Sequence, residues 1–264
     1  MNADDILEAL GLPRRRPDLA YLRDLFDAFS RIVPFESASK IVRDSEIEEP
    51  DAKPRQPETF WEEHLALGTG GTCFARVAAF SRLTESLGFS PVVILGGIMG
   101  SRNHASALFA LGGRTWLADA GYPLPALLPL ESGLTDSPAG TIDFAVSGNT
   151  AALRFVSGPE AGRVIDFSLE PAAEDEFRAA WRRTFSRSSL FLRNVVLRKP
   201  EGHRVFRFFR GTVDVTDAHS RARIPLAEPR PRKLAGLFGV DEDLLARAFE
   251  IAGNPDPERP TARV

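Results

Sequence analysis

Three residues of the chain, Cys73, His104 and Asp119, are of the types that together perform nucleophilic catalysis. Cys73 is the single cysteine among 264 residues, which excludes an internal disulfide and a four-cysteine zinc site. It follows a glycine-rich turn at residues 68–72 and precedes a stretch of helical composition at residues 74–87. A thiol in the first turn of a helix faces unpaired N–H groups and the positive end of the helix dipole, which favours the thiolate form. Two interpretations of Cys73 remain, a reactive nucleophile or an inert buried side chain.

A hairpin at Gly112-Gly113 is predicted to bring His104 and Asp119 together. Residues 105–111 and 115–118 are strand-like runs on either side of the two glycines. The pairing register places His104 nearly opposite Asp119, and opposed residues have Cβ atoms within about 5.5 Å. The carboxylate would then orient the imidazole, whose other nitrogen could take the thiol proton. Alternatively, His104 is a polar residue at a strand edge and Asp119 is a turn former.

Other chemistries have weaker support in the sequence. Residues 68–73 could cradle a phosphate, but no Lys-Ser/Thr pair follows and the preceding segment is helical, which disfavours dinucleotide binding. No His-x-x-x-His motif or carboxylate cluster indicates a metal site. The remaining histidines have no comparable partners and are predicted to be surface or strand-face residues: His64, His203 and His219.

Composition limits the class of protein. The 33 basic and 36 acidic residues give a net charge of −3, which leaves no nucleic-acid footprint. The longest apolar run, residues 91–100, is too short and too rich in glycine to span a membrane. The acidic N-terminus lacks a signal-peptide pattern, so we expect a cytoplasmic location in which a free thiol persists.

The pattern along the chain predicts a helical segment, a β segment and a mixed C-terminal segment. Asp18 is predicted to cap a helix that Pro34 ends. The other predicted helices are residues 60–67, 74–87, 173–186, 231–238 and 241–252, and a surface loop is expected at 46–57. The predicted strands are residues 92–95, 105–111, 115–118, 142–146, 153–156, 164–167, 190–197, 203–209 and 212–215, and a frayed tail is expected at 254–264.

Several motifs together resemble those of the arylamine N-acetyltransferase family. The family's Pro-Phe-Glu-Asn-Leu element is similar to Pro-Phe-Glu-Ser-Ala at residues 34–38, and its Arg-Gly-Gly-x-Cys-Phe is similar to residues 69–74. Its histidine strand and Asp-Val-Gly-Phe element resemble residues 104–108 and 119–122, and residues 181–197 resemble the segment after its barrel. The resemblance covers roughly residues 15–200.

The resemblance implies an α+β fold with a cysteine-protease-like catalytic core. It implies a helical bundle at residues 1–90 that carries the nucleophilic cysteine, a β-barrel at 91–187 that carries the histidine and aspartate, and an α/β lid at 188–264. The implied reaction is ping-pong: the Cys73 thiolate takes an acetyl or other short acyl group from acyl-coenzyme A and passes it to a small-molecule amine. His104 and Asp119 would complete the triad, and Phe35 and Tyr122 would stack on an aryl ring. No permanently bound cofactor is implied.

The sequence departs from the family pattern near the predicted site. Thr69 stands where the family has arginine, so Glu36 lacks the guanidinium partner which that position supplies. Ala75 replaces a glutamate or similar polar residue, and Pro123 replaces a glycine in a loop that contacts coenzyme A in the family. Two alternatives therefore stay open: an amide synthase acting on a carrier-bound polyketide acyl chain, and a non-catalytic member of the family. The Pro-Phe-Glu element argues against a transglutaminase or a cysteine protease.

Overall fold

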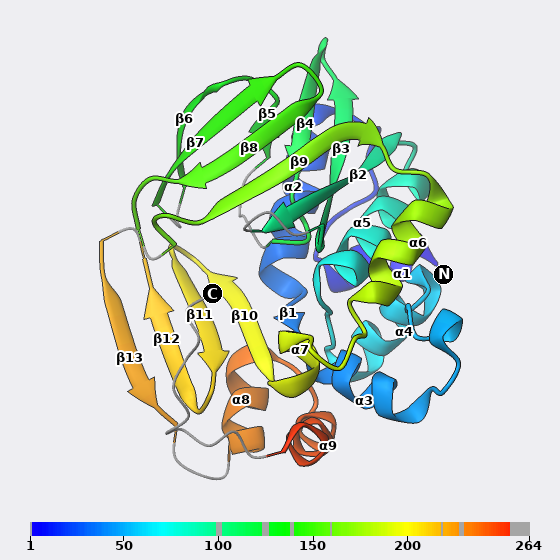
Figure 1. Cartoon of the computed structure of the whole chain (residues 1–264). Coiled ribbons are helices and arrows are strands. Elements are labelled where there is room, and N and C mark those ends of the chain that lie inside the picture. The colour runs from blue at the N-terminus through cyan, green and yellow to red at the C-terminus, as the bar shows by residue number, and fades with distance from the viewer. Residues whose placement is uncertain are drawn as a thin grey trace.

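The computed structural model describes residues 2–98, 102–122, 127–137, 140–158, 160–217, 219–226 and 230–253, and its helices pack beside and below two antiparallel sheets (Figure 1). The helices in this part of the chain are α1 (Ala3–Ala9), α2 (Leu19–Ile32), α3 (Ala38–Glu46), the 3-10 helix η1 (Pro50–Ala52), α4 (Pro57–Leu67), α5 (Cys73–Ser86), α6 (Glu174–Arg183), α7 (Leu190–Arg193), α8 (Arg230–Phe238) and α9 (Glu242–Ala252). The strands are β1 (Phe35–Glu36), β2 (Pro91–Ile98), β3 (His104–Leu111), β4 (Arg114–Ala118), β5 (Leu128–Pro129), β6 (Gly133–Ser137), β7 (Gly140–Ser147), β8 (Thr150–Phe155), β9 (Val164–Pro171), β10 (Val196–Glu201), β11 (Arg204–Phe209), β12 (Thr212–Thr216) and β13 (Arg221–Pro225).

The helical part packs around α2 and α5. Asp18 caps α2 as predicted, because its Oδ1 accepts a hydrogen bond of 2.7 Å from the Tyr21 amide. The apolar residues of α2 recur every three or four positions and are fully buried against α5, as with Leu22, Leu25 and Phe29. The same core reaches β3, so the helix that begins at the cysteine is anchored directly on the hairpin that carries the histidine.

Eight strands form a nearly closed, barrel-like sheet in the order β5-β4-β3-β2-β9-β8-β7-β6. The predicted hairpin is confirmed, because β3 and β4 pair across Gly112-Gly113 with Ala107 opposite Ala118. Continued past the end of β4, this register places Asp119 opposite Ser106 and Gly121 opposite His104, so Asp119 is a diagonal neighbour of His104, the first residue of β3, on the same face. The interior of the sheet holds its own apolar core, which includes Phe144, Phe155 and other aromatic and aliphatic side chains. The predicted α+β class is therefore confirmed.

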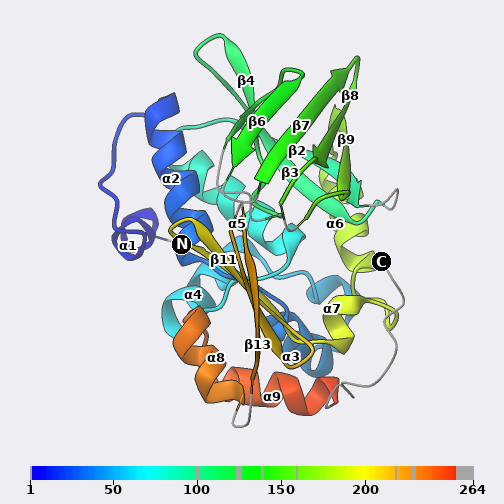
Figure 2. The same cartoon turned by 90° about the vertical axis from the view of Figure 1, so that its left-hand side faces the viewer.

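The remaining sheet has the order β1-β10-β11-β12-β13 and two chemically different faces. Leu197, Phe208 and Val213 share one face, which packs against α8 and α9. Residues one position along each strand lie on the opposite face, which is charged. Figure 2 shows this sheet nearly edge-on, with α8 and α9 at its lower end and the eight-stranded sheet above it.

Two predicted elements differ from the structure. The surface loop expected at residues 46–57 contains the 3-10 helix η1, and its residues Pro54 and Arg55 are buried. Residues 190–197 do not form one strand: Leu190–Arg193 is the short helix α7, and β10 begins only at Val196. A short apolar run is compatible with a strand or with a buried helical turn, so its periodicity does not determine which of the two forms. Here the Phe191 ring packs edge-on against Phe35, and the Asn194 side chain donates to the Leu190 carbonyl, which stabilises the turn.

Two positions named in the sequence analysis lie outside the described residues: Pro123, which replaces a glycine of the family, and the frayed tail expected at residues 254–264. Within the described residues, no helix combines the length and apolar character needed to cross a membrane.

Replacing Asp18 by Ala should lower the free energy of unfolding by about 1 kcal/mol, because the N-terminal amides of α2 lose their cap. Urea denaturation measures this loss. Asp27→Ala is the matched control in the same helix, since Asp27 makes only an exposed ion pair of 3.7 Å with Arg31. Equal losses in the two variants would contradict a capping role.

Candidate active site

Cys73 is the first residue of α5 and follows Thr72 at the N-cap position. It is 7 % exposed, and its Sγ lies 3.5 Å from the Asn103 carbonyl oxygen. The turn before it requires glycine at position 70, where a Cβ atom would lie 1.7 Å from the Pro34 carbonyl oxygen. The close approach of these two backbone segments fixes where the helix begins, and so fixes the thiol at the unpaired amides of the first turn.

His104 and Asp119 form a buried pair, as the hairpin register predicts. His104 Nε2 lies 2.9 Å and 3.0 Å from the two carboxylate oxygens of Asp119, and each side chain is 1 % exposed. The Tyr122 amide donates a further hydrogen bond of 3.0 Å to Asp119 Oδ1. The carboxylate is therefore oriented from two sides.

Gly121 shows that the thiol and the imidazole adjoin the same point. A Cβ atom at this position would lie 2.9 Å from Cys73 Cβ and 3.0 Å from His104 Cε1. Glycine leaves room for both groups, and the structure thus brings Cys73, His104 and Asp119 into one cluster.

The electrostatics of the cluster favour a protonated imidazole. Burial lowers the pKa of His104, but the charge of Asp119 and its hydrogen bonds, together with the interactions of Cys73, outweigh burial and raise this pKa to about 10. An imidazolium at neutral pH is the counter-ion that a Cys73 thiolate requires.

Arg76 holds the surrounding backbone together. It lies three residues after Cys73 on α5, is fully buried, and donates from Nε to the Ala120 carbonyl at 2.7 Å and from Nη1 to the Val33 carbonyl at 2.5 Å. It therefore connects α5 to the residue after Asp119 and to the segment before β1. Burial lowers the pKa of Arg76 to about 9, although the charges of Glu36 and Asp119 oppose this shift.

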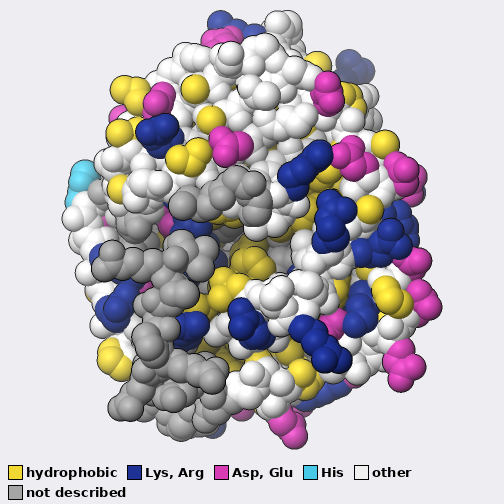
Figure 3. All heavy atoms as spheres, viewed as in Figure 1, with side chains coloured by type: hydrophobic (Ala, Val, Ile, Leu, Met, Phe, Trp, Pro, Cys, Tyr) yellow, Lys and Arg dark blue, Asp and Glu magenta, His cyan; other side chains and the backbone are white. Residues whose placement is uncertain are grey.

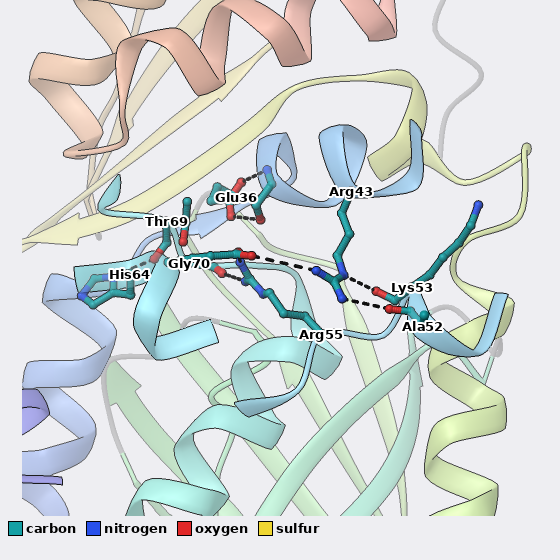
Figure 4. A network of polar contacts seen from close by, with 10 residues as sticks. Glu36, Arg43, Ala52, Lys53, Arg55, His64, Thr69 and Gly70 are labelled. Carbon is teal, nitrogen blue, oxygen red and sulfur yellow. Dashed lines mark hydrogen bonds and ion pairs between the residues drawn. The ribbon is translucent and has the colours of Figure 1, made fainter. Parts of the chain in front are cut away.

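Glu36 is held by Ser39 and forms no ion pair with any described guanidinium group. Glu36 is fully buried and accepts hydrogen bonds from the amide and hydroxyl of Ser39 (Figure 4). Burial lowers the pKa of Arg76, and the charge of Glu36 opposes this larger effect.

Arg55 and His64 brace the loop before the cysteine, as Figure 4 shows. Arg55 is 4 % exposed, donates to the Gly70 carbonyl and pairs with Glu63. His64 Nδ1 lies 2.6 Å from the Thr69 carbonyl oxygen. The prediction that His64 is a surface or strand-face residue is therefore wrong: it is buried on α4, where it contacts the loop.

Lys40 borders a small cavity beside the first turn of α5. The cavity has a volume of about 270 Å³, and its lining includes Lys40, Thr72 and Ala75. Lys40 Nζ donates to the carbonyl and the hydroxyl of Thr184, both at 2.8 Å. Burial lowers the pKa of Lys40 to about 8, and its charge interacts with Cys73.

The two predicted aromatic residues lie on different sides of the cluster. Phe35 forms a bridge with Gly71 next to the cysteine loop. The ring of Tyr122 packs at 5.6 Å from that of Phe155, inside the eight-stranded sheet, and lies 4.7 Å below the Arg198 guanidinium. Both side chains are 8 % exposed.

Three site residues were missed from the sequence: Lys40, Arg55 and Arg76. Arg76 has one local signal, since it is the only charged residue in the buried first two turns of α5. Lys40 and Arg55 have no such signal, because their partners lie on separate elements.

Comparison with known proteins gives a consistent picture. A family model described as N-acetyltransferase matches residues 18–225. The structure is similar to a Mycobacterium smegmatis arylamine N-acetyltransferase, with 19 % sequence identity and a TM-score of 0.81 over 96 % of this chain and 99 % of that one. It is similar to the Salmonella typhimurium arylamine N-acetyltransferase, with 20 % identity and a TM-score of 0.80 over 94 % of this chain and 97 % of that one. It is also similar to a Mycobacterium marinum arylamine N-acetyltransferase in complex with CoA, with 16 % identity and a TM-score of 0.82 over 95 % of this chain and 99 % of that one. No curated protein sequence matches. At these identities the structural likeness shows the fold.

The raised pKa of His104 makes stability depend on pH. Protonation favours the folded state, so this stabilisation is complete below the unfolded pKa of 6.5 and is lost as pH rises toward about 10. A Cys73→Ala background removes the contribution of Cys73 to this shift and keeps that of Asp119, so the free energy of unfolding should still fall, by up to about 1.4 kcal/mol per pH unit, as pH rises above 6.5. Urea denaturation at several pH values measures it. The further change Asp119→Asn should flatten the dependence, and parallel profiles would refute the assignment.

Arg76→Met should lower the free energy of unfolding by about 2 kcal/mol or more, because two buried carbonyls lose their donor. It should also slow alkylation of Cys73 by iodoacetamide, since the backbone beside Asp119 loses its tie to α5. Arg82→Met is the control, because Arg82 lies on the same helix with its side chain 55 % exposed. If the two variants behave alike in both assays, Arg76 has no positioning role.

Proposed function

The chain belongs to the arylamine N-acetyltransferase family, and we propose that it moves an acetyl or other short acyl group from acyl-coenzyme A to an amine through a thioester on Cys73. Membership rests on the family model, which spans residues 18–225, and it makes the protein an acyltransferase. The observation that carries the finer proposal is the buried contact between His104 and Asp119 beside the cysteine at the start of α5.

In the first half-reaction, the Cys73 thiolate attacks the acyl carbonyl carbon of the donor. The bond from this carbon to the coenzyme A sulfur breaks, and the leaving thiolate takes the proton of the His104 imidazolium. Asp119 keeps the imidazole oriented in both protonation states. The amides of the first turn of α5 are placed to stabilise the negative charge that develops on the carbonyl oxygen.

In the second half-reaction, the amine nitrogen attacks the carbonyl carbon of the Cys73 thioester. The carbon–sulfur bond breaks, His104 takes the proton that the nitrogen loses, and the thiolate–imidazolium pair is restored. A thiol suits both steps because it is a good nucleophile and a good leaving group. Lys40 lines the neighbouring cavity and is a second titratable group near Cys73, because burial lowers its pKa to about 8.

The donor assignment has support from a relative and from surface charge. The Mycobacterium marinum structure contains CoA, and its fold matches this chain over 95 % of the length. On the face seen in Figure 3, Lys and Arg side chains gather around a central hollow in which hydrophobic side chains are visible. Such a surface favours the approach of an anionic donor.

The acceptor proposal rests on aromatic side chains. Phe35 borders the cysteine loop through its bridge with Gly71, and its ring packs against Phe191. Tyr122 adjoins Asp119, because its amide donates a hydrogen bond to Asp119 Oδ1. We assign both to the surroundings of an aryl acceptor, which aromatic rings contact favourably in offset or edge-on arrangements.

Incubation with acetyl-coenzyme A should increase the mass of the protein by about 42 Da, the mass of a thioester-linked acetyl group on Cys73. Intact-protein mass spectrometry detects it, and peptide mapping places it. Cys73→Ala should show no adduct, and His104→Gln should form it far more slowly. Addition of an arylamine should remove the adduct and yield the N-acetyl product.

The same measurement separates the alternatives. Acylation by a pantetheine thioester of a carrier but by no short acyl-coenzyme A would replace this proposal with the amide synthase. An unmodified Cys73 after exposure to both donor classes would indicate a non-catalytic member of the family.

A further inference from the structure

A second cavity, of about 430 Å³, lies on the charged face of the five-stranded sheet. It opens between β10, β11 and β12 and the turn that precedes β9. Its lining consists of Glu160, Arg198, Val205, Arg207, Asp214, Thr216 and Arg221. No step of the proposed acyl transfer uses these residues directly.

The pairing of the strands connects this cavity to the cysteine loop. Gly71 bridges Phe35, Phe35 is opposite Arg198, and Arg198 is opposite Arg207. Directly opposed residues share one face of an antiparallel sheet, and neighbouring strands lie about 4.8 Å apart. The backbone of Arg207 is therefore about 10 Å from that of Phe35 on the same face, and the cavity is a short distance from the nucleophile.

Arg198 also contacts the triad's surroundings on its other side. Its guanidinium lies 4.7 Å from the centre of the Tyr122 ring, and the Tyr122 amide donates to Asp119. Arg198 thus lines the cavity and also contacts Tyr122, whose amide donates to Asp119.

The carboxylates of this region are already engaged. Glu160 pairs with Arg198 at 3.2 Å and with Arg163 at 2.8 Å. Asp214 pairs with Arg221 at 2.7 Å, and also with Arg223 at 3.0 Å.

Positive charge is left over after these pairs form. Arg207 is half-buried and makes no hydrogen bond or ion pair with any described residue. It lies directly opposite Arg198, whose Nε is buried without a hydrogen-bond partner and whose side chain is 9 % exposed. On its other side Arg207 lies opposite Asp214, but that carboxylate already pairs with Arg221 and Arg223. Two like charges at opposed positions repel, and a buried N–H group without an acceptor, such as Arg198 Nε, is unfavourable. A bound anion would relieve both.

We propose that this cavity, lined by Arg198, Arg207 and Arg221, binds a phosphate group, and that the phosphate belongs to the coenzyme A part of the donor. Guanidinium groups bind phosphate through paired, charge-assisted hydrogen bonds. The cavity lies on the same face of the sheet as Phe35, beside the cysteine loop. A donor whose phosphate occupies the cavity could therefore extend its thioester end toward Cys73. This assignment rests on the proposed function, since it takes an acyl-coenzyme A as the donor.

The test compares a donor that has phosphates with one that lacks them. Arg207→Met should raise the KM for acetyl-coenzyme A about tenfold more than the KM for S-acetylpantetheine, as expected for the loss of one charge-assisted contact. Arg221→Met should act in the same direction. Arg204→Met is the matched control, because Arg204 lies on the same strand at an exposed position opposite Glu201, and it should change neither constant.

Equal changes for the two donors, or none for either, would overturn the assignment. Calorimetric titration with coenzyme A gives a readout that does not depend on catalysis, and Arg207→Met should weaken binding by a similar factor. If inorganic phosphate binding is lost in Arg207→Met while coenzyme A binding is unchanged, free phosphate is the ligand and the coenzyme A assignment is wrong. Absence of the Cys73 adduct with both donors in the unsubstituted protein would refute the proposed function, and the titration would still test the cavity.

Discussion

The contact between the Asp119 carboxylate and the His104 imidazole is the interaction on which the rest of the site depends. Two groups that are each 1 % exposed can carry opposite charges only because they are paired and hydrogen-bonded, since an isolated buried charge is strongly unfavourable. The hairpin register, the glycine at 121 and the amide of Tyr122 all serve this pair. In the proposed mechanism, Cys73 supplies the nucleophile beside this buried ion pair.

A set of buried cations keeps three distant segments in contact around that pair. Arg76 ties α5 to the backbone before β1 and after β4, and Arg55 ties the loop before α5 to α4. Each donates to main-chain carbonyls, so its effect on the site is to fix backbone position.

The triad was predictable because each member carries a local signal. Cys73 follows glycines at a helix start, and His104 and Asp119 flank a hairpin whose turn is marked by two glycines. The bracing residues were not predictable in the same way. An arginine in a loop, such as Arg55, has the same sequence signature whether it is solvated or donates to a buried carbonyl. The apolar run at α7 was misassigned because its packing on Phe35, far away in the chain, decides its conformation.

The two-residue strand β1 has a consequence for how the enzyme becomes active during synthesis. It belongs by sequence to the helical part, yet it pairs with β10, and Ser37 exchanges hydrogen bonds with Asn194 and Val196 about 160 residues later. Closing so long a loop is slow compared with forming local helices. The wall next to the cysteine loop is therefore completed only after β10 has left the ribosome, and a nascent chain that already contains Cys73, His104 and Asp119 still lacks a finished site.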